Sequence, residues 1–109
     1  MVEVSKVKLL KNIAPLIIKS KTMTKVMITG SLGFVGSETV KLLEKEGHEV
    51  LGYDLMEGNN ICDYQQLESF VRVNQPKRIL HLAAVARFSD ADKDPKLAFE
   101  TNVLGTRNV

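Results

Sequence analysis

A glycine at every third position of one short segment would let the backbone approach a phosphate group closely. These glycines are Gly30, Gly33 and Gly36. Gly30 permits a tight turn out of a strand, Gly33 leaves room for a pyrophosphate, and Gly36 lets a helix pack closely on a strand. A helix beginning behind them would direct the backbone N–H groups of Phe34 and Val35 at the phosphates. The spacing therefore predicts a dinucleotide site.

Asp54 lies 18 positions beyond Gly36, at the end of the next apolar segment. A carboxylate there can accept hydrogen bonds from the adenosine ribose hydroxyls, and its charge would repel the 2′-phosphate of NADP. Positions 55–60 contain no lysine or arginine that could offset that repulsion. We therefore predict NAD as the cofactor in preference to NADP. The competing interpretation is a solvated carboxylate at a strand end, which the distance from the glycines disfavours.

The elements that must hold these residues alternate between strand and helix, which predicts a parallel α/β sheet. The first strand is the apolar run 26–28, and the second is 49–53. The helix between them has one apolar face, and Gly47 ends it as a left-handed cap. That face carries Val35, Thr39, Leu42 and Leu43.

The segment after Asp54 is too short for a full third strand, so we expect that strand to be reduced or nearly absent. Asp63 and Gln66 have the spacing of a capping box, in which each residue bonds the backbone of the other at a helix start. Pro76 then ends the helix. The run Ile79–Ala84 predicts a buried strand, and 87–93 predicts a polar loop.

Asp94 and Pro95 follow as the N-cap and first residue of a last helix, which continues to Val109. Together these segments give the fold class α/β, as the N-terminal half of a doubly wound parallel sheet.

Several motifs together resemble the extended short-chain dehydrogenase/reductase family, also called the NAD-dependent epimerase/dehydratase family. Besides the glycine spacing, they are His81-Leu82-Ala83-Ala84, Asp94-Pro95 and Asn102-Val103-Leu104-Gly105-Thr106. The resemblance covers Lys25–Val109 and implies a Rossmann-type sheet. It also implies an enzyme that transfers hydride through bound NAD, acting on a small molecule such as a nucleotide sugar.

The resemblance also implies roles for individual residues. The backbone at Asn60 and Ile61 would contact the adenine, and Ala83 and Ala84 would line the channel toward the nicotinamide ribose. Many family members have an aspartate at the position of Asn60, whose amide oxygen can still accept a bond from the adenine amino group. Asn102 would support the active-site geometry, the alternative being an asparagine that caps local backbone.

The family's chemistry uses a tyrosine with a lysine four residues later. Neither tyrosine here fits, because Tyr53 is followed at that distance by Glu57 and Tyr64 by Glu68. We expect the catalytic pair beyond Val109 and no activity from these 109 residues alone. The alternative from another functional class is a catalytically silent protein that senses NAD(P).

Three further residues are predicted to be structural rather than catalytic. His81 is expected to pack within an apolar run, and His48 to lie in the turn after Gly47. Cys62 has no metal-ligand partner at a recognised spacing, so no metal site is predicted. As the single cysteine it excludes an internal disulfide and favours the reducing cytoplasm.

Charge divides the chain into two parts. Residues 1–22 hold five lysines against one glutamate, whereas the remainder has ten basic and twelve acidic residues. A weakly acidic body argues against a nucleic-acid partner, and nothing in the composition indicates a membrane span. The apolar stretch Ile13–Ile18 is short, is broken by Pro15 and is followed by no small-residue cleavage site, so we do not expect a targeting signal. A surface-binding amphipathic arm is the less favoured alternative. We expect 1–22 to be an extension outside the fold and 23–109 to be an NAD-binding Rossmann domain, incomplete at its C-terminus. The full-length protein is expected to be a homodimer.

Overall fold

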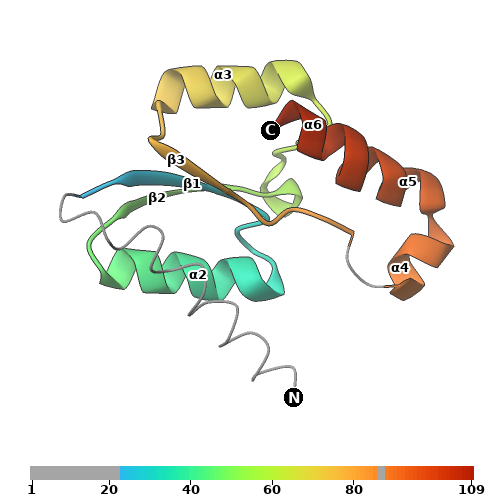
Figure 1. Cartoon of the computed structure of the whole chain (residues 1–109), viewed down its shortest axis with the longest axis horizontal. Helices are drawn as coiled ribbons and strands as arrows, with labels where there is room; N and C mark the ends of the chain where they lie inside the picture. The colour runs from blue at the N-terminus through green and yellow to red at the C-terminus, as the bar shows by residue number, and fades with distance from the viewer. Residues whose placement is uncertain (1–22, 86–87) are drawn as a thin grey trace.

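The computed structural model describes residues 23–85 and 88–109 of the chain. Strands and helices alternate along it (Figure 1). The strands are β1 (Lys25–Thr29), β2 (Glu49–Tyr53) and β3 (Arg78–His81). The α-helices are α2 (Phe34–Lys45), α3 (Tyr64–Asn74), α4 (Phe88–Lys93), α5 (Pro95–Phe99) and α6 (Thr106–Asn108). The predicted extension 1–22 lies outside the described residues.

The three strands form a parallel sheet in the order β2-β1-β3. Figure 1 shows α2 against one face of the sheet and α3 on the opposite side, with the run from α5 to α6 beside α3. This arrangement is the predicted α/β architecture. None of the described helices is both long and apolar enough to cross a membrane.

The central strand β1 supplies both layers of the core. Val26 and Ile28 pack with Leu43 of α2 on one face. Met27 points to the other face, where it packs with Tyr53 and residues of α3. All of the β1 apolar side chains are fully buried, as expected for a strand covered on both faces.

The turn after α2 is built as the sequence predicts. Gly47 has φ +89°, and its N–H donates to the Glu44 carbonyl. His48 is buried beside it, and its Nδ1 accepts the N–H of Thr24 at 3.1 Å. His48 is therefore structural, because it holds the entry to β1.

The strand expected in reduced form between β2 and α3 is absent from the described chain. A single turn of 3-10 helix, Leu55–Glu57, takes its place. The Asp63 carboxylate accepts the N–H of Gln66, which confirms half of the predicted capping box. The other half is wrong. The Gln66 side chain bonds the loop before Asp63 instead, accepting the N–H of Asn60 and donating to the carbonyl of Gly58.

The prediction of a buried strand over Ile79–Ala84 is wrong in both extent and burial. The strand is Arg78–His81, and Ile79 is 38% exposed because β3 lies at the edge of the described sheet. The Leu82 N–H still bonds the Thr29 carbonyl and is shared with the Thr29 hydroxyl, whereas the Ala83 N–H bonds that hydroxyl alone. Apolar composition predicted a strand here but could not show where it would leave the sheet.

The segment after β3 is more helical than its polar composition suggested. The described part of the predicted loop 87–93 is α4, with Asp90 in its first turn and Lys93 in its last, charges that suit the helix dipole. Asp94 caps α5 through the N–H of Leu97, and Pro95 is its first residue, as predicted.

The helix that follows is continuous from Pro95 to Asn108, but its middle, Glu100–Gly105, is π-helical. Such π segments often lie at functional sites. A Cβ on Gly105 would meet the Ile61 side chain at 2.6 Å, so glycine allows the helix to approach that residue.

Candidate functional site

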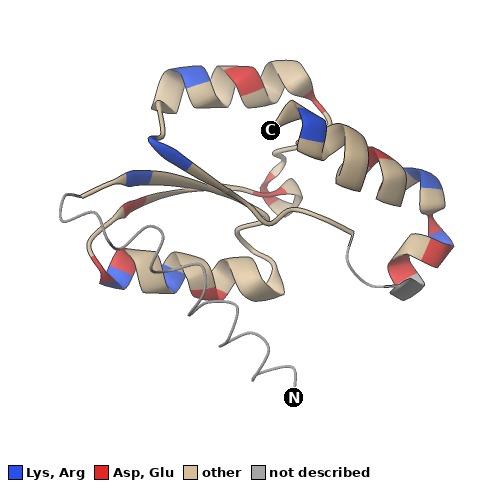
Figure 2. Cartoon of the chain, viewed as in Figure 1, with Lys and Arg blue, Asp and Glu red and all other residues tan. Residues whose placement is uncertain are grey.

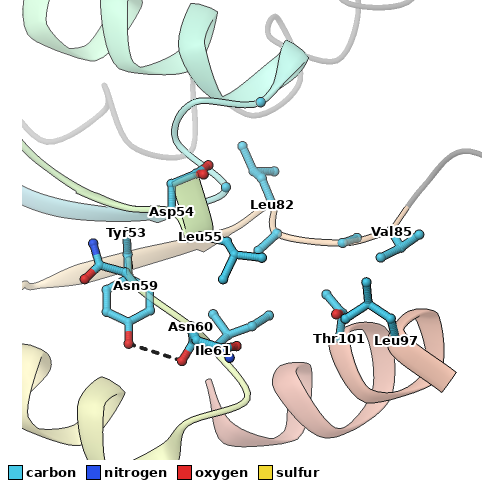
Figure 3. A pocket seen from close by; sticks show the side chains of 14 residues that line it. Tyr53, Asp54, Leu55, Asn59, Asn60, Ile61, Leu82, Val85, Leu97 and Thr101 are labelled. Atoms are coloured by element: carbon cyan, nitrogen blue, oxygen red, sulfur yellow. Dashed lines mark hydrogen bonds between the residues drawn. The ribbon is translucent and has the colours of Figure 1, made fainter. Parts of the chain in front are cut away.

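A pocket opens at the carboxyl ends of the strands, where ligands bind in doubly wound sheets. One wall combines the glycine loop with the loop after β2, and the other combines the chain after β3 with α5 and the π segment (Figure 3). Of the predicted residues it brings together Gly30, Gly33, Asp54, Asn60, Ile61, Ala83 and Ala84. It adds seven that sequence reasoning did not assign to it: Tyr53, Leu55, Asn59, Leu82, Val85, Leu97 and Thr101.

The glycine loop is packed too tightly for side chains at two of its three glycines. Gly30 has φ +71°, and a Cβ there would lie 2.8 Å from the backbone nitrogen of Ala83. A Cβ on Gly36 would lie 1.9 Å from the Gly30 carbonyl oxygen. Gly36 thus lets α2 approach the loop itself rather than the strand, whereas Gly33 lines the pocket together with Gly30.

Asp54 is buried at the pocket wall and holds two loops together. One carboxylate oxygen accepts the N–H of Leu32 at 3.0 Å, and the other accepts the N–H of Met56 at 2.9 Å. Each oxygen keeps a lone pair for a further donor. Among the described lining residues Asp54 has the only charged side chain. Figure 2 shows the basic residues of β1 and β3 at the opposite end of the sheet.

Asn60 lies at one end of the pocket with its amide oriented by the chain. Its Oδ1 accepts the N–H of Cys62 at 2.9 Å, and its backbone carbonyl accepts the hydroxyl of Tyr53 at 3.4 Å (Figure 3). The Tyr53 ring is fully buried and stands edge-on to Phe70, with centroids 4.9 Å apart. The pKa of Tyr53 is raised by burial and by the nearby charge of Asp63.

Cys62 is partly buried, as expected, and its Sγ donates to the carbonyl of Glu100 at 3.4 Å. This contact joins the loop before α3 to the π segment.

Side-chain hydrogen bonds hold the opposite end of the pocket. Thr29 Oγ1 accepts the N–H groups of Leu82 at 3.0 Å and Ala83 at 3.2 Å. The Asn102 side chain accepts the N–H of Val85 at 2.7 Å and donates to the Val85 carbonyl at 3.0 Å. Asn102 bonds backbone 17 residues away, so it is not a local helix cap. It does not line the pocket but fixes residues that do.

His81 is a partly buried residue of β3, as the prediction of a packed strand residue requires, but its side chain bonds two hydroxyl groups instead of packing among apolar side chains. Its Nδ1 lies 2.6 Å from the Thr29 hydroxyl, and its Nε2 lies 2.8 Å from the Thr106 hydroxyl. Because Thr29 Oγ1 already accepts two N–H groups, its proton is directed to Nδ1. Burial lowers the pKa of His81. The strand-end position of Thr29 was the only sequence signal for this network.

Phe34, Val35 and Gly36 do not line the pocket either. They form the first turn of α2, directly behind Gly33, which is the N-cap of that helix. The N-terminal end of α2 therefore adjoins the pocket at Gly33, as the phosphate prediction requires.

The model of the NAD-dependent epimerase/dehydratase family matches residues 26–109. The chain belongs to this family. Among its relatives is the UDP-glucose 4-epimerase of Rhizobium meliloti (strain 1021), 29% identical over 94 residues, a match covering 74% of this chain and 29% of the relative.

Two solved structures of similar proteins were determined with different dinucleotides. Thermus thermophilus UDP-glucose 4-epimerase, in complex with NAD, has a TM-score of 0.71 and 32% identity, covering 77% of this chain and 32% of its own. Bacillus anthracis dTDP-4-dehydrorhamnose reductase, in complex with NADP, has a TM-score of 0.72 and 29% identity. The match covers 83% of this chain and 32% of the reductase chain. The chain thus spans about a third of the length of these proteins.

The residues present fit a dinucleotide. The loop contains glycines where a Cβ would collide with backbone, and the adjoining pocket contains a buried carboxylate with spare acceptor capacity. A pocket lined mainly by apolar groups suits the apolar faces of nucleotide rings.

Proposed function

We propose that this chain binds NAD and forms the cofactor-binding part of a nucleotide-sugar epimerase or dehydratase. The position of Asp54 is the observation that carries the proposal. It is buried, lies at the end of β2 and lines the pocket beside Gly33. Family membership alone does not choose between NAD and NADP, since similar proteins are solved with each. The charge of Asp54 favours NAD.

The proposed contacts follow the pocket from end to end. Asn60 and Ile61 receive the adenine, and Asp54 the adenosine ribose. The pyrophosphate lies over Gly33, toward the amides of Phe34 and Val35 at the start of α2. The nicotinamide ribose reaches Ala83 and Ala84. Asn102 acts indirectly, since it holds Val85 at that end.

Bound NAD supplies a nicotinamide ring that can accept and return a hydride. The residues that the structure describes bind and orient the NAD, and none of these described residues is placed to transfer a proton to a substrate. Tyr53 is buried with a raised pKa, the wrong direction for a tyrosine that must give up its proton. Tyr64 lies on a different surface, near Arg72 and Val109. We therefore propose that the family's Tyr-x-x-x-Lys pair acts from outside these residues and that they have no turnover alone.

Two substitutions test the cofactor assignment by titration with NAD and NADP. Asp54→Ala should weaken NAD binding by about 1 to 3 kcal/mol, because it removes the hydrogen bonds to the ribose hydroxyls. It should also narrow the preference for NAD over NADP, because it removes the repulsion of the 2′-phosphate. Gly33→Val should weaken both cofactors together, because a branched side chain would occupy the phosphate approach. Thermal unfolding of Asp54→Ala checks that losing the bonds to Leu32 and Met56 has not unfolded the loops. A wild-type preference for NADP would refute the role of Asp54.

We further propose that the protein works in the reducing cytoplasm, because Cys62 is unpaired and is the single cysteine of the sequence.

A further inference from the structure

The loop between Asp54 and Asp63 forms the adenine end of the pocket without a strand to support it. Its described residues contain a 3-10 turn, then Gly58 in a left-handed conformation with φ +84°. Asn59 and Asn60 follow, and both line the pocket. A loop of this kind needs partners for its backbone polar groups from elsewhere in the fold.

Gln66 of α3 supplies two of those partners, and Asn108 of α6 bonds the carbonyls of Ile61 and Cys62. Gln66 Oε1 accepts the N–H of Asn60 at 2.8 Å, and Gln66 Nε2 donates to the carbonyl of Gly58 at 2.8 Å. One amide side chain thus bonds an N–H and a C=O two residues apart, as the backbone of a neighbouring strand would. The Tyr53 hydroxyl adds a bond to the Asn60 carbonyl at 3.4 Å and lies 3.3 Å from Gln66 Oε1.

We propose that Gln66 is a positioning residue that sets the adenine end of the pocket and thereby the recognition of the adenine amino group. This inference rests on the proposed NAD site and adds to it a residue that does not line the pocket. Gln66 fixes the backbone of Asn60, and the N–H of Cys62 fixes the orientation of the Asn60 amide.

The fixed orientation has a chemical consequence. Because Asn60 Oδ1 accepts the Cys62 N–H, the side-chain amide cannot turn its NH₂ group to the same place without losing that bond. Oδ1 keeps a second lone pair, which we assign to the ligand. Adenine offers a donor there in its amino group, whereas hypoxanthine offers a carbonyl oxygen, which an acceptor repels.

The test compares the binding of NAD with that of nicotinamide hypoxanthine dinucleotide, in which a carbonyl oxygen replaces the amino group and the neighbouring ring nitrogen N1 carries a proton. Wild type should bind NAD about five- to tenfold more tightly, the range of one hydrogen bond. Gln66→Met keeps the length of the side chain but removes its three bonds, and should reduce the ratio to within about twofold. Gln65→Met is the matched control, since Gln65 is the exposed neighbour on the same helix. It should keep the wild-type ratio.

Gln66→Glu separates the two halves of the contact. It retains the acceptor for Asn60 and Tyr53 but loses the donor to Gly58, so its ratio should lie between those of wild type and Gln66→Met. This variant also decides the question if Gln66→Met fails to fold, as judged by thermal unfolding.

The inference would be overturned if either Gln66 variant kept the wild-type ratio between the affinities for the two dinucleotides. This holds even if the variant bound both dinucleotides more weakly, because Gln66 would then be merely structural. Equal binding of the two dinucleotides by wild type would overturn it as well while leaving the NAD site intact. Failure of wild type to bind either dinucleotide would instead refute the proposed function.

Discussion

The glycine loop on one side of the pocket is fixed by backbone packing. Residues 82–85 on the other side contact that loop at Gly30 but depend in addition on side-chain hydrogen bonds. At Gly36 the backbones come so close that a Cβ would lie 1.9 Å from a carbonyl oxygen. Across the pocket, Thr29 and Asn102 bond the backbone of the segment after β3.

The two walls should respond differently to amino-acid substitutions. Close backbone packing tolerates no added atom, because a main-chain carbonyl cannot rotate away. Hydrogen bonds from side chains can be removed one at a time, and each removal costs a limited amount. We therefore expect large, abrupt effects on the glycine side and smaller, graded effects on the other.

Gly36→Ala should have the largest effect on stability. Its Cβ would overlap the Gly30 carbonyl, so α2 or the loop must move, and the free energy of unfolding should fall by about 3 kcal/mol or more. Urea-induced unfolding measures the change. Gly33→Ala is the control from the same loop, because its Cβ would lie 3.2 Å from the same oxygen and φ is −72°. It should cost less than about 1 kcal/mol. Equal losses in the two variants would remove the packing argument.

The same contrast explains how much the sequence predicted. The glycine wall depends on residue type and spacing within one segment, so Gly30, Gly36 and the start of α2 could be predicted without coordinates. The caps at Gly47, Asp63 and Asp94 are equally local, and the structure contains all of them.

The opposite wall joins residues far apart in sequence, and no local spacing encodes such contacts. Thr29 bonds Ala83 across 54 residues, and His81 bonds Thr106 across 25. The sequence therefore suggested apolar neighbours for the His81 side chain, which instead bonds two threonines that are distant in sequence. The prediction that β3 is buried was wrong for a related reason, because the position of a strand in the sheet depends on the topology of the whole fold.

Thr29→Val should have the largest effect on the hydrogen-bonded wall. The substitution keeps the shape of the side chain but leaves the Ala83 N–H and His81 Nδ1 without their partner, which should cost about 2 kcal/mol. Thr39→Val is a control at an equally buried threonine, whose hydroxyl bonds only the Val35 carbonyl within α2. Hydrogen exchange of the Ala83 amide should accelerate in the first variant alone. Unchanged exchange at Ala83 would show that Thr29 does not hold this wall.

Asn102→Ala should have a smaller effect, because the Asn102 side chain is exposed and water can replace part of what is lost. Removing both bonds to Val85 should cost about 1 kcal/mol. Asn102→Asp retains an acceptor for the Val85 N–H but loses the donor to its carbonyl, so it should fall between wild type and alanine. If urea unfolding showed Asn102→Asp to be less stable than Asn102→Ala, the paired bonds to Val85 would not stabilise the wall.

The smallest effect should be a dependence of stability on pH through His81. Burial lowers the pKa of His81 in the folded protein, so the unfolded chain binds the proton more readily. Stability should therefore decline as the pH falls below about 6.5, the ordinary pKa of histidine, and the decline should end below the folded pKa. Protonation also places a donor at Nδ1, facing the Thr29 proton. His81→Asn keeps an acceptor for Thr29 but takes up no proton in this range, and all other titratable groups are the same in the two proteins. Between pH 8 and pH 5, the unfolding free energy of wild type should therefore fall by more than that of His81→Asn. A constant difference over that range would show that His81 is protonated equally easily in the folded and unfolded states.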